Sequence, residues 1–417
     1  MVLEKAIRWI GQRKLAIAIL AVAIALAIPT SSILLKPSLR EYLYREISYQ
    51  LLADRIAGGE TDPERIAIRV TDYVEENLYP AGGPVLDVTS WSDLVRGIGW
   101  CDQDDWALAT LLSKKGIHAR FAMLKDKQGS SPHTMAEVFL GGQWRVFDPL
   151  FGLVFYNSRD HSLTTMSDLS ANPSIIFDNP RIRALPEQSR HKVEEFFSRM
   201  FPIPEKPNRW GSLLEAKNVG APRRTVNNVI RLSLSLFGPR VAYLFQDLYL
   251  GMLPDRLIAL DRGIRSGNRP VFLASSEDPA LFLFYKARNY HLYERSTLAE
   301  KFYKEIILRY PNSYYAEKSS YFLGDLSLRV VRNYPSAVSR FRDFLDKYPG
   351  SNWTSLARYS LGVAYEKMGD LEEARRYYTL ASPDPYVAAA YRLVELGFES
   401  GSEPVLSVPP ALGRPGS

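Results

Sequence analysis

Three residues of the chain have the side-chain types that thiol-based acyl transfer requires: Cys101, His133 and Asp148. A thiolate is a strong nucleophile, an imidazole can take and return its proton, and a carboxylate can hold the imidazole in one orientation. Cys101 is the only cysteine in 417 residues, so no internal disulfide can form. Its thiol is therefore either a small buried side chain or a reactive group, and its surroundings must distinguish the two.

A helix that begins at Cys101 would favour the reactive alternative. Leu108 and Leu112 follow Cys101 on one helical face, and Gly116 ends the pattern. The helix dipole and the free N–H groups of the first turn stabilise a thiolate and can bind an oxyanion. Three carboxylates in this part of the helix act against it, because nearby negative charge disfavours a thiolate. They are Asp102, Asp104 and Asp105.

The histidine and the aspartate are predicted to meet across a β-hairpin. Two strand-like runs, which end at Leu140 and begin at Gln143, are separated by two glycines, a turn signal. With the glycines in the turn, Met135 lies opposite Asp148, and His133 is the diagonal neighbour of Asp148 on the same face. Diagonal pairs lie about 7–8 Å apart at the backbone, within reach of these side chains. Taken singly, each residue would be an ordinary polar strand residue, so the predicted pairing carries the hypothesis.

Further elements are predicted before the cysteine and after its helix. Thr61 or Asp62 can cap a helix that has Pro63 in its first turn. A strand-like run at 117–124 follows the cysteine helix. Together with the hairpin, these elements predict an α+β domain with an antiparallel sheet.

The order of these motifs resembles the transglutaminase-like superfamily, which has a papain-like Cys-His-Asp site. The resemblance covers roughly residues 60–155. It rests on Gly116-Ile117-His118-Ala119-Arg120, on His133-Thr134 with Glu137-Val138, and on Trp144-Arg145-Val146-Phe147-Asp148-Pro149. It implies that Cys101 is the nucleophile, His133 the base and Asp148 the orienting acid. It also implies an acyl-enzyme formed from a peptide or carboxamide bond and resolved by water or by an amine.

The resemblance also raises two points about neighbouring residues. Family members often have a small residue where this chain has Asp105, so the packing of the helix and the pKa of the thiol depart from the pattern. In some members an upstream tryptophan assists the oxyanion. Trp91 and Trp100 are candidates for this role, with core packing as the alternative.

A repeat occupies residues 279–397. Ala299 recurs as Ala337, and the Tyr-Pro pair at 310–311 recurs at 348–349, with a constant offset of 38 residues. A third start is indicated at Gly369. Helix pairs with this period stack into a solenoid. The pattern resembles the tetratricopeptide family, which implies a surface that binds a protein partner or substrate; a helical spacer without a partner is the alternative.

The N-terminus has the features of a membrane segment. Four basic residues precede an uncharged stretch from Leu15 to Leu35, and a bilayer core requires roughly 20 residues. Positive charge before the stretch predicts a cytoplasmic N-terminus and an extracytoplasmic, periplasmic remainder. A cleaved signal peptide ending near Ala27, which would give a secreted protein, and a buried helix are the alternatives.

The composition excludes several function classes. The net charge is +6, and no basic stripe with interleaved aromatics predicts nucleic-acid binding. No metal-ligand spacing, Walker loop or dinucleotide fingerprint is present in the sequence, so neither a metal nor a cofactor is expected.

The predicted organisation has six parts in chain order. They are a transmembrane or signal anchor at 1–36, a helical stalk at 37–60, the transglutaminase-like domain at 61–180, a helical connecting region at 181–278, the all-α repeats at 279–397 and a disordered tail at 398–417.

Two functional hypotheses follow. The first is a membrane-anchored thiol enzyme, a protease, amidase or acyltransferase, whose substrate is open and which performs either hydrolysis or amide transfer. The second is a non-catalytic membrane-tethered scaffold or an assembly factor for cell-envelope or surface-polymer export. A non-catalytic domain would be expected to lose at least one of the three site residues, whereas all three are present.

Overall fold

The computed structural model describes a defined part of the chain, and contacts divide the whole chain into two compact units. One unit is 1–48 with 216–254, and the other is 49–215 with 255–417. The predicted anchor, most of the connecting region and the predicted disordered tail lie outside the described residues. The described residues are 37–80, 89–126, 128–129, 131–157, 161–185, 187–200, 208–211 and 279–384.

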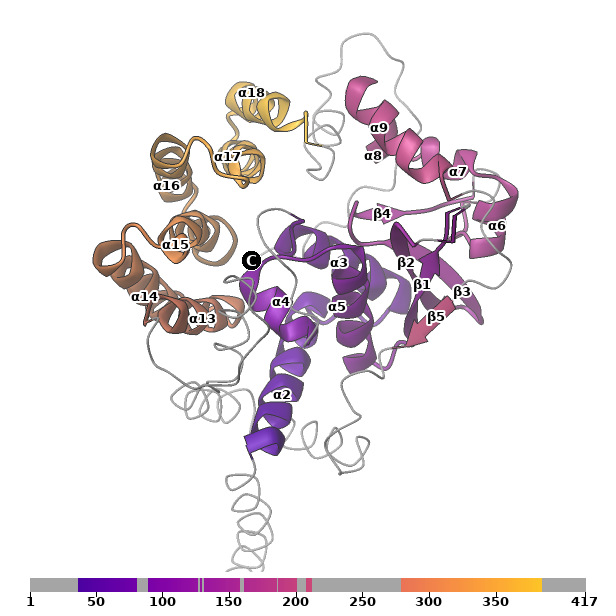
Figure 1. Cartoon of the computed structure of the whole chain (residues 1–417), viewed down its shortest axis with the longest axis horizontal. Helices are drawn as coiled ribbons and strands as arrows, with labels where there is room; N and C mark the ends of the chain where they lie inside the picture. The colour runs from indigo at the N-terminus through magenta and orange to yellow at the C-terminus, as the bar shows by residue number, and fades with distance from the viewer. Residues whose placement is uncertain are drawn as a thin grey trace, which may run out of the picture. The chain divides into compact units, whose positions relative to one another are not determined.

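A five-stranded antiparallel sheet, in the order β4-β3-β2-β1-β5, forms the centre of one domain (Figure 1). The hairpin has the predicted register, from Leu140 opposite Gln143 to Ala136 opposite Phe147. The two turn glycines have φ of 57° and 81°, as a type I′ turn requires. The strands are β1 (Ala119–Leu124), β2 (His133–Leu140), β3 (Gln143–Asp148), β4 (Leu153–Val154) and β5 (Asn208–Gly211).

Helices before the sheet follow from local signals. Asp62 caps α3 by accepting a hydrogen bond from the Glu64 N–H at 3.2 Å. The helix of the cysteine begins at Cys101, as predicted, and packs against β1 and β2. The helices of this part are α2 (Pro37–Ala57), α3 (Pro63–Asn77), α4 (Ser90–Arg96) and α5 (Cys101–Lys114).

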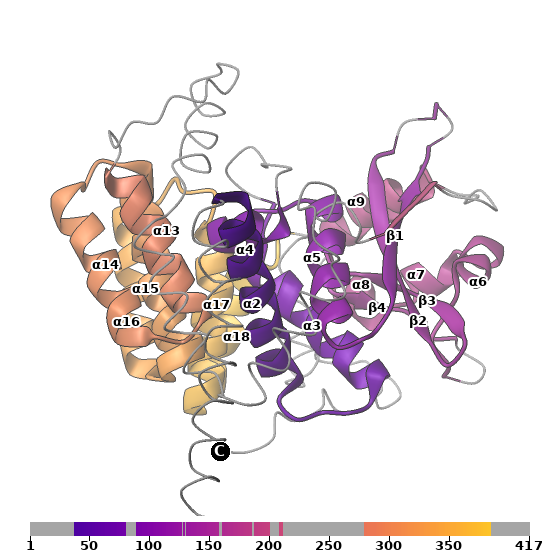
Figure 2. The same ribbon diagram turned by 90° about the horizontal axis from the view of Figure 1, so that it is seen from below.

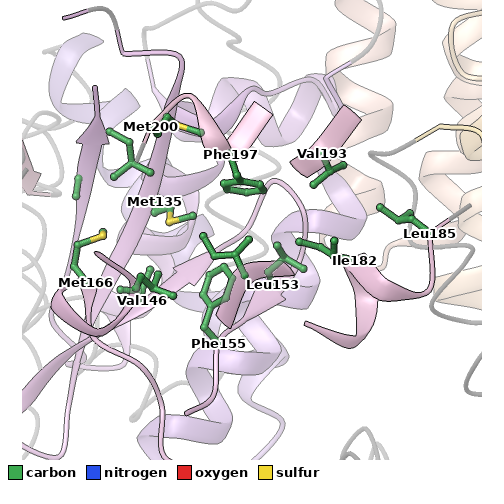
Figure 3. Close-up of a cluster of buried hydrophobic side chains, with 14 of the residues drawn as sticks. Met135, Val146, Leu153, Phe155, Met166, Ile182, Leu185, Val193, Phe197 and Met200 are labelled. Atoms are coloured by element: carbon green, nitrogen blue, oxygen red, sulfur yellow. The ribbon is translucent and has the colours of Figure 1, made fainter. Parts of the chain in front are cut away.

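Four short helices between β4 and β5 form an apolar core with one face of the sheet. Met135 and Val146 extend from the strands into this cluster, and Val193 and Phe197 of α9 close it (Figure 3). Burial of these apolar side chains holds α9 in place over the sheet. The helices are α6 (Met166–Ala171), α7 (Ser174–Phe177), α8 (Pro180–Arg183) and α9 (Glu187–Ser198).

The C-terminal helices alternate in direction and lie in two layers, with α13, α15 and α17 in one and α14, α16 and α18 in the other (Figures 1 and 2). The equivalent Ala299 and Ala337 are both fully buried, as the repeat predicts. The helices are α13 (Pro279–Leu292), α14 (Ser296–Arg309), α15 (Tyr314–Asp325), which continues as the π-helix η2 (Leu326–Val331), α16 (Tyr334–Lys347), α17 (Thr354–Met368) and α18 (Leu371–Ala381).

The described helices do not include a membrane-spanning segment. None of them is both long and apolar enough to cross a bilayer. The stretch from Leu15 to Leu35 is outside this part of the chain, so the predicted anchor stays a prediction.

Glu75 of α3 is a buried carboxyl whose ionisation should make stability depend on pH. Its side chain is 8% exposed, and its Oε1 lies 3.9 Å from Nη1 of Arg181. Burial raises the pKa of Glu75 from 4.5 to about 7, although the Arg181 charge acts in the opposite direction. The folded protein therefore keeps a proton that the unfolded chain releases between these values, so stability is lost as the pH rises through this window.

Replacing Glu75 by glutamine should remove this pH dependence. The variant should gain up to roughly 3 kcal/mol over the wild type between pH 4.5 and pH 8, since one pKa unit corresponds to about 1.4 kcal/mol. Urea unfolding of both proteins at these pH values measures the difference. The control is Glu64→Gln, at an exposed position of the same helix. An equal response of wild type and Glu75→Gln to pH would show that Glu75 ionises normally.

Candidate active site

His133 and Asp148 meet where β2 begins and β3 ends. Nε2 of His133 lies 2.7 Å from Oδ2 of Asp148, and both side chains are fully buried. The other carboxylate oxygen, Oδ1, accepts a hydrogen bond of 3.3 Å from the backbone N–H of Phe151. The turn after β3 therefore holds the carboxylate, and the carboxylate orients the imidazole.

Cys101 lies at the N-terminus of α5 and interacts with the same imidazole. Because Nε2 of His133 is bonded to Asp148, Nδ1 is the ring nitrogen left for the thiol; Nδ1 is buried and makes no hydrogen bond of good geometry within the described residues. Burial raises the pKa of Cys101, but the hydrogen bond and the charge of His133, with contacts from Thr134, outweigh burial and lower it. The surroundings of Cys101 therefore favour its thiolate more than bulk water does.

The imidazole shows the complementary effect. Burial lowers the pKa of His133, but the charge of Asp148, the hydrogen bond to Asp148 and the interaction with Cys101 outweigh burial and raise it well above its ordinary value. A lowered thiol pKa beside a raised imidazole pKa favours a thiolate–imidazolium pair.

The aspartates that follow the cysteine oppose this pair less than their sequence position predicts. Asp102 is exposed, whereas Asp104 and Asp105 are almost completely buried. Burial, followed by the negative charge of Cys101, raises the pKa of Asp104 well above its usual value. Burial does the same for Asp105, although Thr134 acts in the opposite direction. Both carboxyls thus ionise less readily than exposed aspartates, which weakens their opposition to a thiolate.

Three phenylalanines surround the imidazole of His133. The rings of Phe151, Phe196 and Phe197 make edge contacts with it, at centroid distances of 5.9, 5.4 and 5.5 Å. Two of them belong to α9, within the segment that the sequence assigns only to a connecting region. This part of the connecting region is helical, as predicted, but nothing in its sequence pattern predicts contact with the histidine.

The two tryptophans predicted as oxyanion candidates have different surroundings. Trp91 is buried, and its Nε1 donates to Oδ1 of Asn289 at 3.3 Å. Its indole N–H therefore joins α4 to α13, which agrees with core packing rather than with an oxyanion role. Trp100 immediately precedes Cys101 and is 43% exposed. Trp100 is therefore the tryptophan that flanks the thiol.

The other four histidines do not join the site. His118, His161 and His191 are exposed, and His291 is buried among the repeat helices, where its Nδ1 lies 3.0 Å from the hydroxyl of Tyr303. Within the part of the chain that the structure describes, no group of histidine, cysteine and acidic residues could hold a metal ion.

Comparison with known proteins identifies part of the repeats. The family model "Tetratricopeptide repeat" matches residues 356–380. These residues belong to α17 and α18, so the matched unit begins with the helix after Tyr348-Pro349, not with the helix before it. Repeats of this kind generally mediate protein–protein interaction, which supports a protein partner. A search of curated proteins finds no match to the chain.

Proposed function

We propose that the chain is a thiol enzyme of the transglutaminase-like type, with Cys101 as nucleophile, His133 as base and Asp148 as orienting acid. The observation that carries the proposal is the buried bond of 2.7 Å between Nε2 of His133 and Oδ2 of Asp148, which leaves Nδ1 for the chain's only thiol. A nucleophile, its base and a third group that orients the base are the parts that covalent acyl transfer needs.

The reaction begins from the thiolate–imidazolium pair. The thiolate of Cys101 forms a C–S bond to a peptide or carboxamide carbonyl, and the carbonyl oxygen becomes an oxyanion near the free N–H groups of the α5 N-terminus. Collapse of this intermediate breaks the C–N bond, and His133 gives its proton to the leaving amine. Water or a second amine then attacks the thioester and loses a proton to His133. The C–S bond breaks, which releases an acid or a new amide and restores the thiolate.

The rest of the proposal concerns location and partner. Residues 15–35 anchor the chain in a membrane, with its bulk on the extracytoplasmic side, because basic residues precede the apolar stretch. The repeats at 279–397 bring a protein substrate or an assembly partner to the thiol domain.

Trapping of the acyl-enzyme tests the proposed chemistry. The full chain is mixed with activated peptide esters, and intact-mass spectrometry should show one acyl group per chain. Cys101→Ala should show none, and His118→Ala, at an exposed histidine away from the site, should match the wild type. If the wild type forms no adduct and its thiol is alkylated no faster than free cysteine, the proposed function is wrong.

One observation favours the non-catalytic alternative. His133 is completely buried beneath phenylalanine rings, and a substrate must displace or bypass them to reach the imidazole. A scaffold or envelope assembly factor needs no such access. The trapping experiment separates the two functions, because a scaffold forms no thioester.

A further inference from the structure

One layer of the repeat helices, formed by α13, α15 and α17 and called the inner layer below, lies against the segment that leads into Cys101. Helix α4 ends at Arg96, and residues 97–100 connect it to the thiol at the start of α5. Figures 1 and 2 show α4 between α13 and α5, and α4 contacts both helices. No sequence pattern predicts which residues join the repeats to the thiol domain.

Arg288 of α13 binds the last turn of α4. The side chain is completely buried, its Nε donates to the Val95 carbonyl at 2.8 Å, and its Nη2 donates to the Leu94 carbonyl at 3.0 Å. Carbonyls in the last turn of a helix have no partner within the helix, so a basic side chain from another element can satisfy them. Arg288 thus fixes the end of α4 from the repeat domain.

Phe322 of α15 connects Arg288 to Gly97, the first residue after α4. The Arg288 guanidinium lies 3.7 Å from the Phe322 ring centroid, a cation–π contact. The same ring lies against Gly97, where a Cβ would be 2.8 Å from Cζ of Phe322 and 3.5 Å from the Trp353 ring. Gly97 also has φ of 68°, which favours glycine. The repeats therefore contact the main chain four residues before the nucleophile.

The remaining sides of this connecting segment are also occupied. The Tyr79 N–H donates to the Gly97 carbonyl at 3.3 Å, and the Gly99 N–H donates to the Tyr79 carbonyl at 3.4 Å. A Cβ on Gly99 would lie 2.5 Å from Oδ1 of Asp104 in α5. With so little free space, a shift of α4 must be transmitted to the start of α5.

We propose that Arg288, with Phe322, is a positioning residue that sets the alignment of Cys101 with His133, so that the repeat domain controls the reactivity of the thiol. The proposal rests on the proposed function, because it concerns the thiol of that site. Its physical basis is that the pairing of thiol and imidazole depends on distance and angle, which the end of α4 determines through the connecting segment. The repeats thus act on the site from their inner layer of helices.

The pH profile of alkylation tests this, since Cys101 is the only cysteine and every alkylation reports on it. The full chain is reacted with iodoacetamide from pH 4 to pH 9. Arg288→Lys keeps the charge but cannot bind both carbonyls in the same geometry. The midpoint of its alkylation pH profile should rise by about one pH unit, and its alkylation rate at pH 6 should fall by about 5-fold. The control is Arg340→Lys, since Arg340 also donates to a main-chain carbonyl, Leu323, at 3.0 Å, but within the repeats.

A second pair of variants keeps the test decisive if changes at Arg288 impair folding. Gly97→Ala places a methyl group against the Phe322 ring and should raise the midpoint in the same direction. Phe322→Leu removes the ring that joins Arg288 to Gly97, so it should raise the midpoint in the same direction. A structural defect without an effect on alignment would lower thermal stability and leave the midpoint unchanged.

The outcomes separate this proposal from the proposed function. If the wild type has a lowered midpoint but folded Arg288→Lys and Gly97→Ala share it, the positioning role is wrong and the enzyme proposal stands. If the wild-type midpoint is that of free cysteine, the proposed function fails and the positioning role fails with it. A raised midpoint in Arg288→Lys, in Gly97→Ala and in Phe322→Leu supports the positioning role.

Discussion

Replacing His133 by alanine should slow formation of the acyl-enzyme at neutral pH by about 100- to 10,000-fold, the usual contribution of a general acid–base group. The reason is that His133 lowers the pKa of the Cys101 thiol, and that in the proposed mechanism it supplies the proton for the leaving amine. Without the imidazole, the midpoint of the alkylation profile should rise to that of an ordinary cysteine, about 8.5. Stopped-flow measurement of acylation and alkylation across the pH range gives both quantities.

The alkylation measurement separates loss of activation from loss of folding. Alkylation at pH 6 should fall by about 10-fold or more, although a more basic thiolate is intrinsically a better nucleophile. The exposed His191 of α9 offers a matched control, and His191→Ala should leave both profiles unchanged. An unaltered midpoint in a folded His133→Ala protein would mean that the imidazole does not activate the thiol.

Replacing Asp148 by alanine should destabilise the fold by about 3–5 kcal/mol, because it removes one partner of a buried pair. His133 and Asp148 are both fully buried, so solvent cannot replace the lost carboxylate. The variant should also have a raised thiol midpoint, since the imidazolium that stabilises the thiolate depends on Asp148. Urea unfolding and the alkylation profile measure the two effects on one sample.

The effect of pH on this variant has a definite sign. The raised pKa of His133 contributes stability that is complete below the unfolded value of about 6.5 and is lost as the pH rises through the folded value. The excess stability of the wild type over Asp148→Ala should therefore be larger at pH 6 than at a pH above the folded value. Asp148→Asn keeps an acceptor for Nε2 without the charge, so its stability should lie between the two. Equal stability of Asp148→Ala and the wild type at pH 6 would contradict a charged pair.

The pKa shifts of two aspartates were decided by burial, which the sequence alone could not supply. From the sequence, Asp104 and Asp105 act against a thiolate at Cys101. In the folded chain both carboxyls are buried, and their pKa values are raised because burial penalises the charged form. Burial depends on the elements that pack around the two residues, so the local sequence does not predict it.

The sequence by itself determined the local parts of the site. The Gly-Gly turn and the alternation of the strands determined the hairpin register, and this register brings His133 to Asp148. The helical spacing after Cys101 determined where α5 begins, and the 38-residue offset determined the repeat. Each of these signals is contained within one turn, one helix or one period, so nearest neighbours along the chain suffice to specify it.

Only the tertiary structure decided what surrounds these parts. Strand β5 pairs with the free edge of β1, and Phe196 covers His133, although neither segment carries a periodic signal for that contact. Arg288 reaches the carbonyl of Val95 across 193 positions of the chain. Such contacts arise when segments far apart in the chain are packed together to bury apolar surface and to satisfy polar groups. Local sequence patterns specify which faces must be buried but not which segment covers them, so the partners of the Cys101 segment emerged only from the folded chain.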